Sequence, residues 1–142
     1  MTPMKTLTAH SLDTGWTCAY FELDPGLYEF MKDVSVPLLA DWSFDKAKVE
    51  NWAAHLQRDF VLEPTEDCIN YFLLIDSAPA GAKIYINGEA VAVYQTPGPD
   101  DPAYELDITY YVALGKNEIG FRVAWDAPGT FSGVRLQPVR CA

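Results

Sequence analysis

The second half of the chain alternates apolar and polar positions with a period of two, and turn residues interrupt this alternation at short intervals. Residues 69–77 are rich in β-branched and aromatic side chains, and two further short runs, 83–86 and 89–94, flank an Asn-Gly dipeptide. Because both central positions of a type I′ turn need positive φ, Asn87-Gly88 predicts a tight antiparallel hairpin. The pattern therefore predicts strands, and no helix, throughout this half of the chain.

Three more strands follow from the same pattern, at residues 105–112, 118–125 and 133–139. The segment Gln95–Tyr104 between them holds three prolines, one glycine and two aspartates, and it predicts a surface loop because proline cannot donate to a strand ladder. Another break falls at Pro128-Gly129. Short strands separated by frequent turns are typical of an all-β fold, and we expect an antiparallel β-sandwich with at most one short helix.

The first half allows two interpretations of one segment. Val49, Trp52 and Leu56 recur at helical spacing behind a possible cap at Asp45, which favours an amphipathic helix. The alternation from Leu56 to Leu62 favours a strand instead. We expect a short helix or helical turn over 45–52, followed by a strand over 54–62.

The composition indicates one globular domain, residues 1–142. The chain is 49% hydrophobic, long enough to form a core, and has no apolar run of the length that a membrane-spanning helix needs. Twenty acidic and ten basic residues give a net charge of −10, which disfavours nucleic acid and anionic membranes as partners. A neutral or cationic partner fits better, and a neutral saccharide is compatible with this charge. A protein partner or a second copy of the chain is the alternative.

The cysteines predict the compartment. Cys18, Cys68 and Cys141 are an odd number with wide spacing, and the first residues carry no apolar segment of the kind found in secretory signals. We therefore expect three reduced thiols in a cytoplasmic protein, with Cys18 and Cys68 buried as small apolar side chains.

A series of short motifs resembles the sugar-binding, galactose-binding-like domain at the front of family 2 glycoside hydrolases. Each motif is weak alone, and their order along the chain carries the resemblance. In chain order they are Ser11-Leu12-Asp13, Gly15-Trp16, Val36-Pro37 with Trp42, Arg58-Asp59-Phe60-Val61-Leu62 with Pro64, Asn87-Gly88, Asp107-Ile108-Thr109, Gly115-Lys116-Asn117 and Ser132-Gly133-Val134-Arg135-Leu136.

The resemblance implies a jelly-roll β-sandwich and a role in binding carbohydrate. Enzymes of this family carry their two catalytic glutamates in a separate barrel domain, so the resemblance implies a non-catalytic, stand-alone module. The chain departs from the family pattern at 96–104, where the enzymes usually have a Gly-Gly-aromatic loop leading to Pro-Phe. The main alternative is a protein-interaction or assembly domain that uses the same sandwich as a scaffold.

Aromatic side chains in or beside loops are the candidates for ligand binding, because an aromatic face stacks on the C–H face of a pyranose. Trp42, Tyr94 and Tyr104 meet this criterion, and Asp100 and Asp101 are candidate acceptors for sugar hydroxyls. The competing interpretation is that these aromatics simply cover one end of the sandwich.

Other conspicuous residues have a structural interpretation. Trp16, Trp52 and Trp125 lie on patterned segments and are expected in the core. Asn87-Gly88 and Asp107 are expected to serve turns, through positive φ and through bonds to nearby backbone N–H groups respectively. No metal-ligand spacing, nucleophile motif or carboxylate pair is evident in the sequence, so we expect no cofactor and no catalytic residue.

Overall fold

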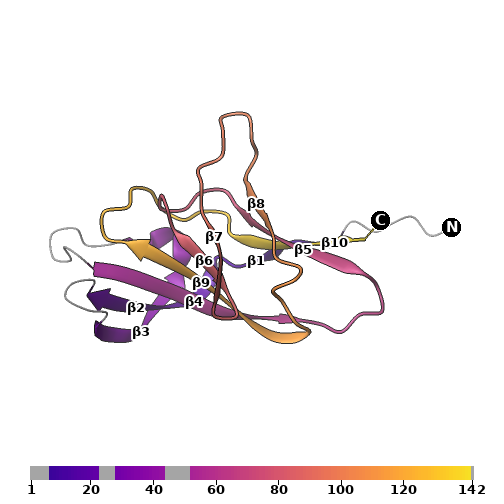
Figure 1. The fold of residues 1–142 in the computed structure, drawn as a ribbon, viewed down its shortest axis with the longest axis horizontal. Coiled ribbons are helices and arrows are strands. Elements are labelled where there is room, and N and C mark those ends of the chain that lie inside the picture. Colours follow the sequence, from indigo (N-terminus) through magenta and orange to yellow (C-terminus); the bar gives the residue numbers. More distant parts are fainter. Residues whose placement is uncertain (1–6, 23–27, 44–51, 142) are drawn as a thin grey trace.

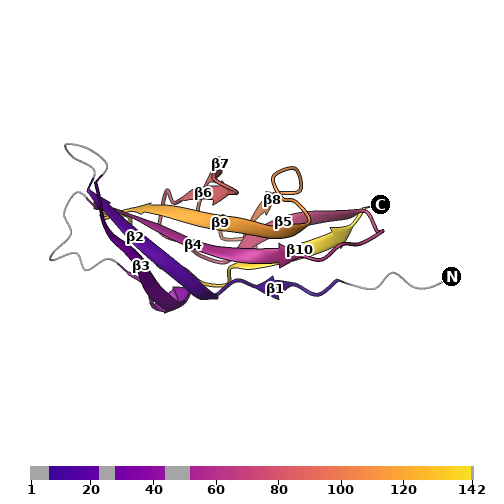
Figure 2. The same cartoon turned by 90° about the horizontal axis from the view of Figure 1, so that it is seen from below.

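The chain forms two antiparallel β-sheets, which confirms the predicted all-β sandwich (Figures 1 and 2). The computed structural model describes residues 7–22, 28–43 and 52–141. Within that part every named element is a strand except one 3-10 turn, η1 (Leu39–Asp41). The four-stranded sheet has the order β1 (His10–Ser11), β10 (Arg135–Arg140), β5 (Ile69–Ile75), β8 (Tyr104–Asp107). The six-stranded sheet has the order β3 (Tyr28–Leu38), β2 (Thr14–Glu22), β4 (Trp52–Leu62), β9 (Gly115–Ala124), β6 (Lys83–Ile86), β7 (Glu89–Val93).

Inward-facing side chains of both sheets form one core. Leu56 of β4, Ile84 of β6 and Phe121 of β9 are fully buried on the six-stranded sheet, and they face Leu73 and Leu136 of the other sheet. Each is separated from the next inward residue of its own strand by one outward residue, as the pleat requires. The period-two pattern of the sequence therefore predicted which face of each strand is buried.

The predicted hairpin is present, and its turn is fixed by more than backbone preference. Asn87 has φ 51° and Gly88 φ 81°, as a type I′ turn requires. The Asn87 side-chain amide donates to the carbonyl of Tyr111 at 2.9 Å, and its oxygen accepts from the backbone N–H of Glu118 at 2.8 Å. Asn87 thus ties the β6–β7 hairpin to the segment that leads into β9, which confirms its structural role.

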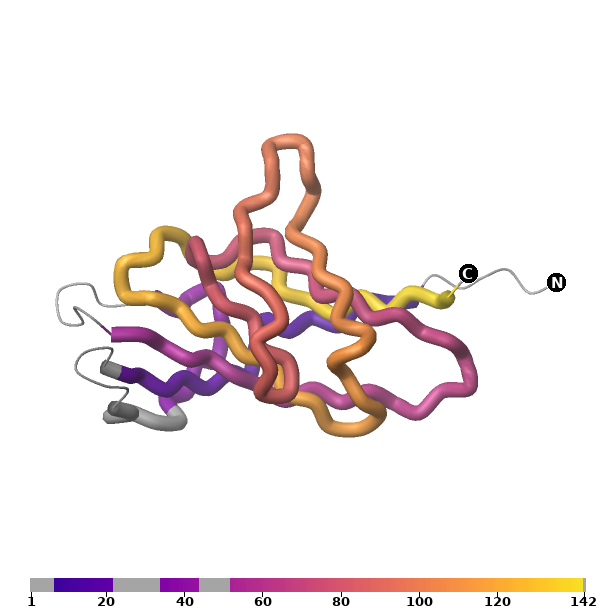
Figure 3. Tube along the Cα trace, viewed as in Figure 1, coloured from indigo at the N-terminus to yellow at the C-terminus, as the bar shows by residue number. Residues whose placement is uncertain are grey.

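An arm, residues 95–103, connects β7 at the edge of one sheet with β8 at the edge of the other. It projects well beyond the body of the sandwich (Figures 1 and 3). At its tip the Asp101 carboxylate accepts from the backbone N–H of Gly98 at 3.2 Å, and the Asp101 N–H donates to the Gly98 carbonyl at 3.0 Å. The predicted surface loop is confirmed, with a tight turn at its end.

The strand predicted at 105–112 is wrong in length, because β8 ends at Asp107. The Asp107 carboxylate accepts from the backbone N–H of Thr109 at 2.9 Å and from its hydroxyl at 2.5 Å. This side-chain turn replaces the strand ladder, as short acidic residues often do. The role predicted for Asp107 is confirmed by these same bonds.

In the first half, the predicted strand at 54–62 is confirmed as β4, which starts two residues earlier at Trp52. The predicted helical segment was 45–52, and all of it except Trp52 lies outside the described residues. Trp52 itself belongs to the strand, so the strand interpretation is correct wherever the structure describes this region.

The expectation of three reduced thiols is wrong. Cys68 and Cys141 form a disulfide, while Cys18 is free and buried. The two bonded cysteines flank paired ends of neighbouring strands, since Ile69 of β5 lies opposite Arg140 of β10. Cys68 is exposed and not buried as expected. Sheet pairing brings together two residues that are 73 positions apart in sequence.

Candidate functional site

The five predicted ligand-binding residues do not form one concave patch. Trp42 and Tyr94 are buried, at 8% and 3% exposure, and Tyr104 is half-buried. Asp100 and Asp101 are exposed on the arm. The position of Trp42, Tyr94 and Tyr104 in or beside loops therefore did not leave these side chains fully exposed to solvent. The two aspartates do not line the pocket described below.

Tyr94 and Tyr104 fix the base of the arm. Their rings meet edge to face at 5.2 Å between centroids, and the backbone N–H of Tyr94 donates to the Ala82 carbonyl at 2.8 Å. Burial raises the pKa of the Tyr104 phenol, since the charged form would lose hydration. These contacts support the interpretation that the two tyrosines close the sandwich where the arm begins.

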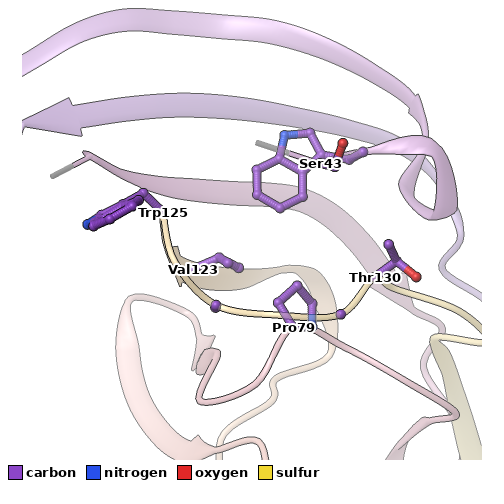
Figure 4. A pocket seen from close by; sticks show the side chains of 8 residues that line it. Ser43, Pro79, Val123, Trp125 and Thr130 are labelled. Atoms are coloured by element: carbon purple, nitrogen blue, oxygen red, sulfur yellow. The ribbon is translucent and has the colours of Figure 1, made fainter. Parts of the chain in front are cut away.

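A pocket of about 310 Å³ opens beside the turn that follows β9 (Figure 4). Two indoles contribute to it, together with the side chains of one serine and one threonine. Its lining consists of Trp42, Ser43, Pro79, Val123, Trp125, Ala127, Gly129 and Thr130. We call this the Trp125 pocket. It draws on both sequence halves, and Figure 4 shows the five labelled side chains of Ser43, Pro79, Val123, Trp125 and Thr130 around it.

A series of aromatic contacts through the core positions Trp42. Trp16 stacks on Phe121 with centroids 5.3 Å apart, and Phe121 contacts Phe131 at 5.0 Å. Phe131 in turn contacts Trp42 at 6.1 Å. Ring pairs in this distance range stabilise a fixed mutual orientation. The indole of Trp42 is therefore held against the core on one side while it lines the pocket.

The indole N–H of Trp42 is also satisfied, because it donates to the Tyr20 hydroxyl at 3.2 Å. Burial raises the pKa of Tyr20, and burial also raises the pKa of the nearby Cys18 thiol to about 11. Both groups therefore stay neutral at physiological pH. These two groups near Trp42 are thus uncharged, and the thiol is not a reactive one.

Trp125 is the pocket residue that sequence reasoning missed. Its place in the alternating run Ile119, Phe121, Val123 assigned it to the core. The strand ends at Ala124, however, and Trp125 is only partly buried where the chain leaves the sheet. The usable signal was its position at the very end of the run, next to the Pro128-Gly129 break. Trp16 is in the core as predicted, at 1% exposure, whereas Trp52 is only partly buried.

A second pocket of about 400 Å³ adjoins the first and shares Gly129 and Thr130 with it. Tyr94 and Thr96 contribute to its lining. Gly129 has φ 107°, and a side chain there would meet the Ala78 carbonyl oxygen at 3.1 Å. The shared wall between the pockets therefore requires glycine.

Among the described residues that line these two pockets there is no acid and no base. Among the described residues, no group of three His, Cys, Asp or Glu side chains is arranged to hold a metal ion, and no helix has the length and apolarity to cross a membrane. The pockets thus offer ring faces, hydroxyls and backbone groups. This chemistry suits binding of an uncharged polar molecule.

Comparison with known proteins gives structural matches only, since no protein-family model and no curated protein matches the chain. A glycosyl hydrolase family 2 member from Bacteroides cellulosilyticus is 21% identical with a TM-score of 0.60, and covers 94% of this chain and 21% of its own. A rhamnosidase from Novosphingobium is 23% identical with a TM-score of 0.59, over 95% of this chain and 15% of its own.

A β-D-glucuronidase from Dictyoglomus thermophilum is 17% identical with a TM-score of 0.59, over 97% of this chain and 29% of its own. In each case nearly all of this chain matches a small part of a much longer one. The chain thus has the β-sandwich fold that these glycoside hydrolases contain as one part of their structure, which confirms the predicted resemblance in fold.

Proposed function

We propose that the chain is a non-catalytic carbohydrate-binding module and that its binding site is the Trp125 pocket. The observation that carries the proposal is a partly exposed indole, Trp125, beside a second, rigidly held indole, Trp42, in one opening. Pyranose rings present a face of C–H groups that packs on an indole, and their edges present hydroxyls. Ser43 and Thr130 also line this pocket and supply hydroxyl partners.

The size and charge of the pocket restrict the ligand. About 310 Å³ is at the small end of ligand pockets, so a mono- or disaccharide unit fits better than a long chain. The described part of the lining is uncharged, which favours a neutral sugar over a charged one, because a buried charge needs a partner. The expected role of Asp100 and Asp101 as hydroxyl acceptors does not belong to this site, since neither residue lines it.

The non-catalytic part of the proposal follows from the same lining. Glycoside hydrolysis generally uses two carboxyl groups on either side of the scissile bond. The described residues that line the Trp125 pocket contribute none. Binding without turnover is the function that these side chains support.

The Cys68–Cys141 disulfide is evidence about the cellular compartment in which the protein works. The cytoplasmic location expected from the sequence depended in part on reduced thiols, and the bond removes that part of its support. Disulfides persist mainly in oxidising environments. We therefore infer that the module works outside the reducing cytoplasm, where free saccharides and glycan chains are also encountered.

Titration calorimetry against a panel of neutral mono- and disaccharides tests the proposed function. We expect millimolar to micromolar affinity for at least one sugar and its loss in Trp125→Ala, because the indole face provides most of the apolar contact. Tyr110→Ala is the matched control, since Tyr110 is 94% exposed and lies outside the pocket. Absence of saturable binding across the panel, or equal binding by wild type and Trp125→Ala, would refute the proposal.

A further inference from the structure

Two cationic side chains lie next to each other on the outer face of the six-stranded sheet. Lys83 of β6 is directly opposite Arg122 of β9, and Arg122 is directly opposite His55 of β4 on its other side. The neighbouring residues Ile84 and Phe121 are core residues, so alternation places Lys83 and Arg122 on the face turned away from the other sheet. Figure 1 shows β6, β9 and β4 side by side.

Arg122 is held in place by aromatic rings. Its guanidinium carbon lies 5.4 Å from the centroid of Phe21 and 5.2 Å from that of Tyr85. His55 of β4 meets Tyr85 of β6 edge on at 5.4 Å and so supports that ring from the far side of β9. A guanidinium that stacks between rings loses little further freedom when it binds an anion.

Four other cations, Arg58, Lys116, Arg135 and Arg140, are already engaged. Lys116 pairs with an aspartate at 3.2 Å, Arg135 at 3.0 Å and Arg140 at 3.4 Å. Arg58 donates to the Thr14 carbonyl at 2.6 Å.

Lys83 and Arg122 are different. Among the described residues neither has an ion-pair partner, and the Arg122 Nε is buried without an acceptor. Like charges directly opposite on neighbouring strands destabilise a sheet. An acidic chain that nevertheless leaves these two together presents a local site for negative charge.

We propose that the Lys83–Arg122 pair is a docking surface for an extended, acidic segment of a partner protein. Neighbouring strands are about 4.8 Å apart, and alternate residues of an extended segment are about 6.7 Å apart on one face. Long Lys and Arg side chains readily span that difference. An extended segment laid across β6 and β9 therefore brings two carboxylates, at positions i and i+2, to the two cations.

A protein segment fits this face better than a small acid does. A single carboxylate neutralises one cation, whereas two carboxylates on one segment neutralise both and gain from being linked. The aromatic rings of Phe21 and Tyr85 beside Arg122 also supply apolar contact area of the type that is enriched at protein interfaces. The surface is on the outside of a sheet and does not include the lining of the Trp125 pocket.

The test is an NMR titration of the whole chain at 0.15 M salt, a condition that screens the long-range repulsion between acidic molecules. The probe is an acetylated, amidated peptide of alternating Gly and Glu, and the same peptide with Gln in place of Glu is its control. We expect saturable shifts in the amides of β6, β9 and β4 with the Glu peptide alone. We expect affinity to fall at least about tenfold in Arg122→Gln, because a charge-assisted bond is lost.

Two further variants keep the proposal falsifiable if Arg122→Gln disturbs the sheet. Lys83→Gln changes an exposed residue and should also weaken binding, whereas Lys116→Gln, whose charge is already paired, should leave binding unchanged. Unsaturable or uniformly distributed shifts, or equal weakening by Lys116→Gln, would overturn the proposal. So would shifts that depend on protein concentration without peptide and disappear in Asp100→Asn/Asp101→Asn, since a second copy would then be the occupant.

Discussion

Reduction of the Cys68–Cys141 bond should lower the stability of this fold by a large fraction of its total. The bond joins residues 73 apart, and the loop-closure entropy of the unfolded chain for that length corresponds to about 4 kcal/mol at 25 °C. A domain of this size typically has about 5–15 kcal/mol in all. The reduced chain is thus expected to remain folded but to be much closer to its unfolding transition.

The folded state itself should change little on reduction. β5 and β10 remain paired along six residue positions, and the Cys141 N–H donates to the Cys68 carbonyl at 3.0 Å whether or not the sulfurs are joined. The destabilisation should therefore come mainly from the greater freedom of the unfolded chain. The free buried thiol of Cys18 plays no part in the bond.

Urea unfolding followed by tryptophan fluorescence, with and without reductant, measures the effect. At a typical slope of about 2 kcal/mol per molar urea, we expect the midpoint to fall by roughly 2 M, and the melting temperature by roughly 8–16 °C. The double variant Cys68→Ser/Cys141→Ser should match the reduced wild type and show no response to reductant. A midpoint that is unchanged on reduction would refute the reasoning, because it would mean that the bond does not constrain the unfolded chain.

Two other predictions follow from the core and from the turn after β8. Phe131→Ala removes the ring between Phe121 and Trp42. A buried Phe-to-Ala change should lower the free energy of unfolding, measured with urea, by about 3–5 kcal/mol. A decrease below about 1 kcal/mol would show that Phe131 does not bridge the two rings. The hydrogen bonds from Thr109 lower the pKa of Asp107 below its ordinary value of 3.8. The ionised carboxylate therefore stabilises the fold fully above the ordinary pKa, and this stabilisation is lost as the pH falls through the lowered pKa. The stability advantage of wild type over Asp107→Asn should therefore shrink between pH 5 and pH 2, and an advantage that grows with acidity would contradict this assignment.

Local chemistry in the sequence predicted the parts of the fold that local chemistry controls. Asn87-Gly88 specified its turn because few residues accept positive φ, and alternation identified the buried face of β9. The length of β8 was harder to predict, because Asp107 ends it through its own side chain and not through a glycine or proline. The segment before β4 was ambiguous because apolar residues at 49, 52 and 56 fit a helix while 56–62 fits a strand.

The candidate site depended on information that is not local. Trp42 and Tyr94 are in loops by sequence, yet Phe131 and Tyr104 from distant positions cover them. Trp125 follows the core pattern, yet the strand ends one residue before it. The disulfide became evident only when β5 and β10 were paired in register. For Trp42 and for the disulfide, the deciding contact joins residues far apart in the chain, which periodicity cannot detect.

The arm at 95–103 has a consequence for how related chains can diversify. Its base is fixed by the contact between Tyr94 and Tyr104, whereas within the described structure its tip is held by its own Gly98–Asp101 turn. Exposed loop tips of this kind accept insertions and foreign sequences without loss of the parent fold. The sandwich can therefore acquire new recognition segments at the arm over evolution, or by grafting in the laboratory, while both sheets and the Trp125 pocket stay as they are.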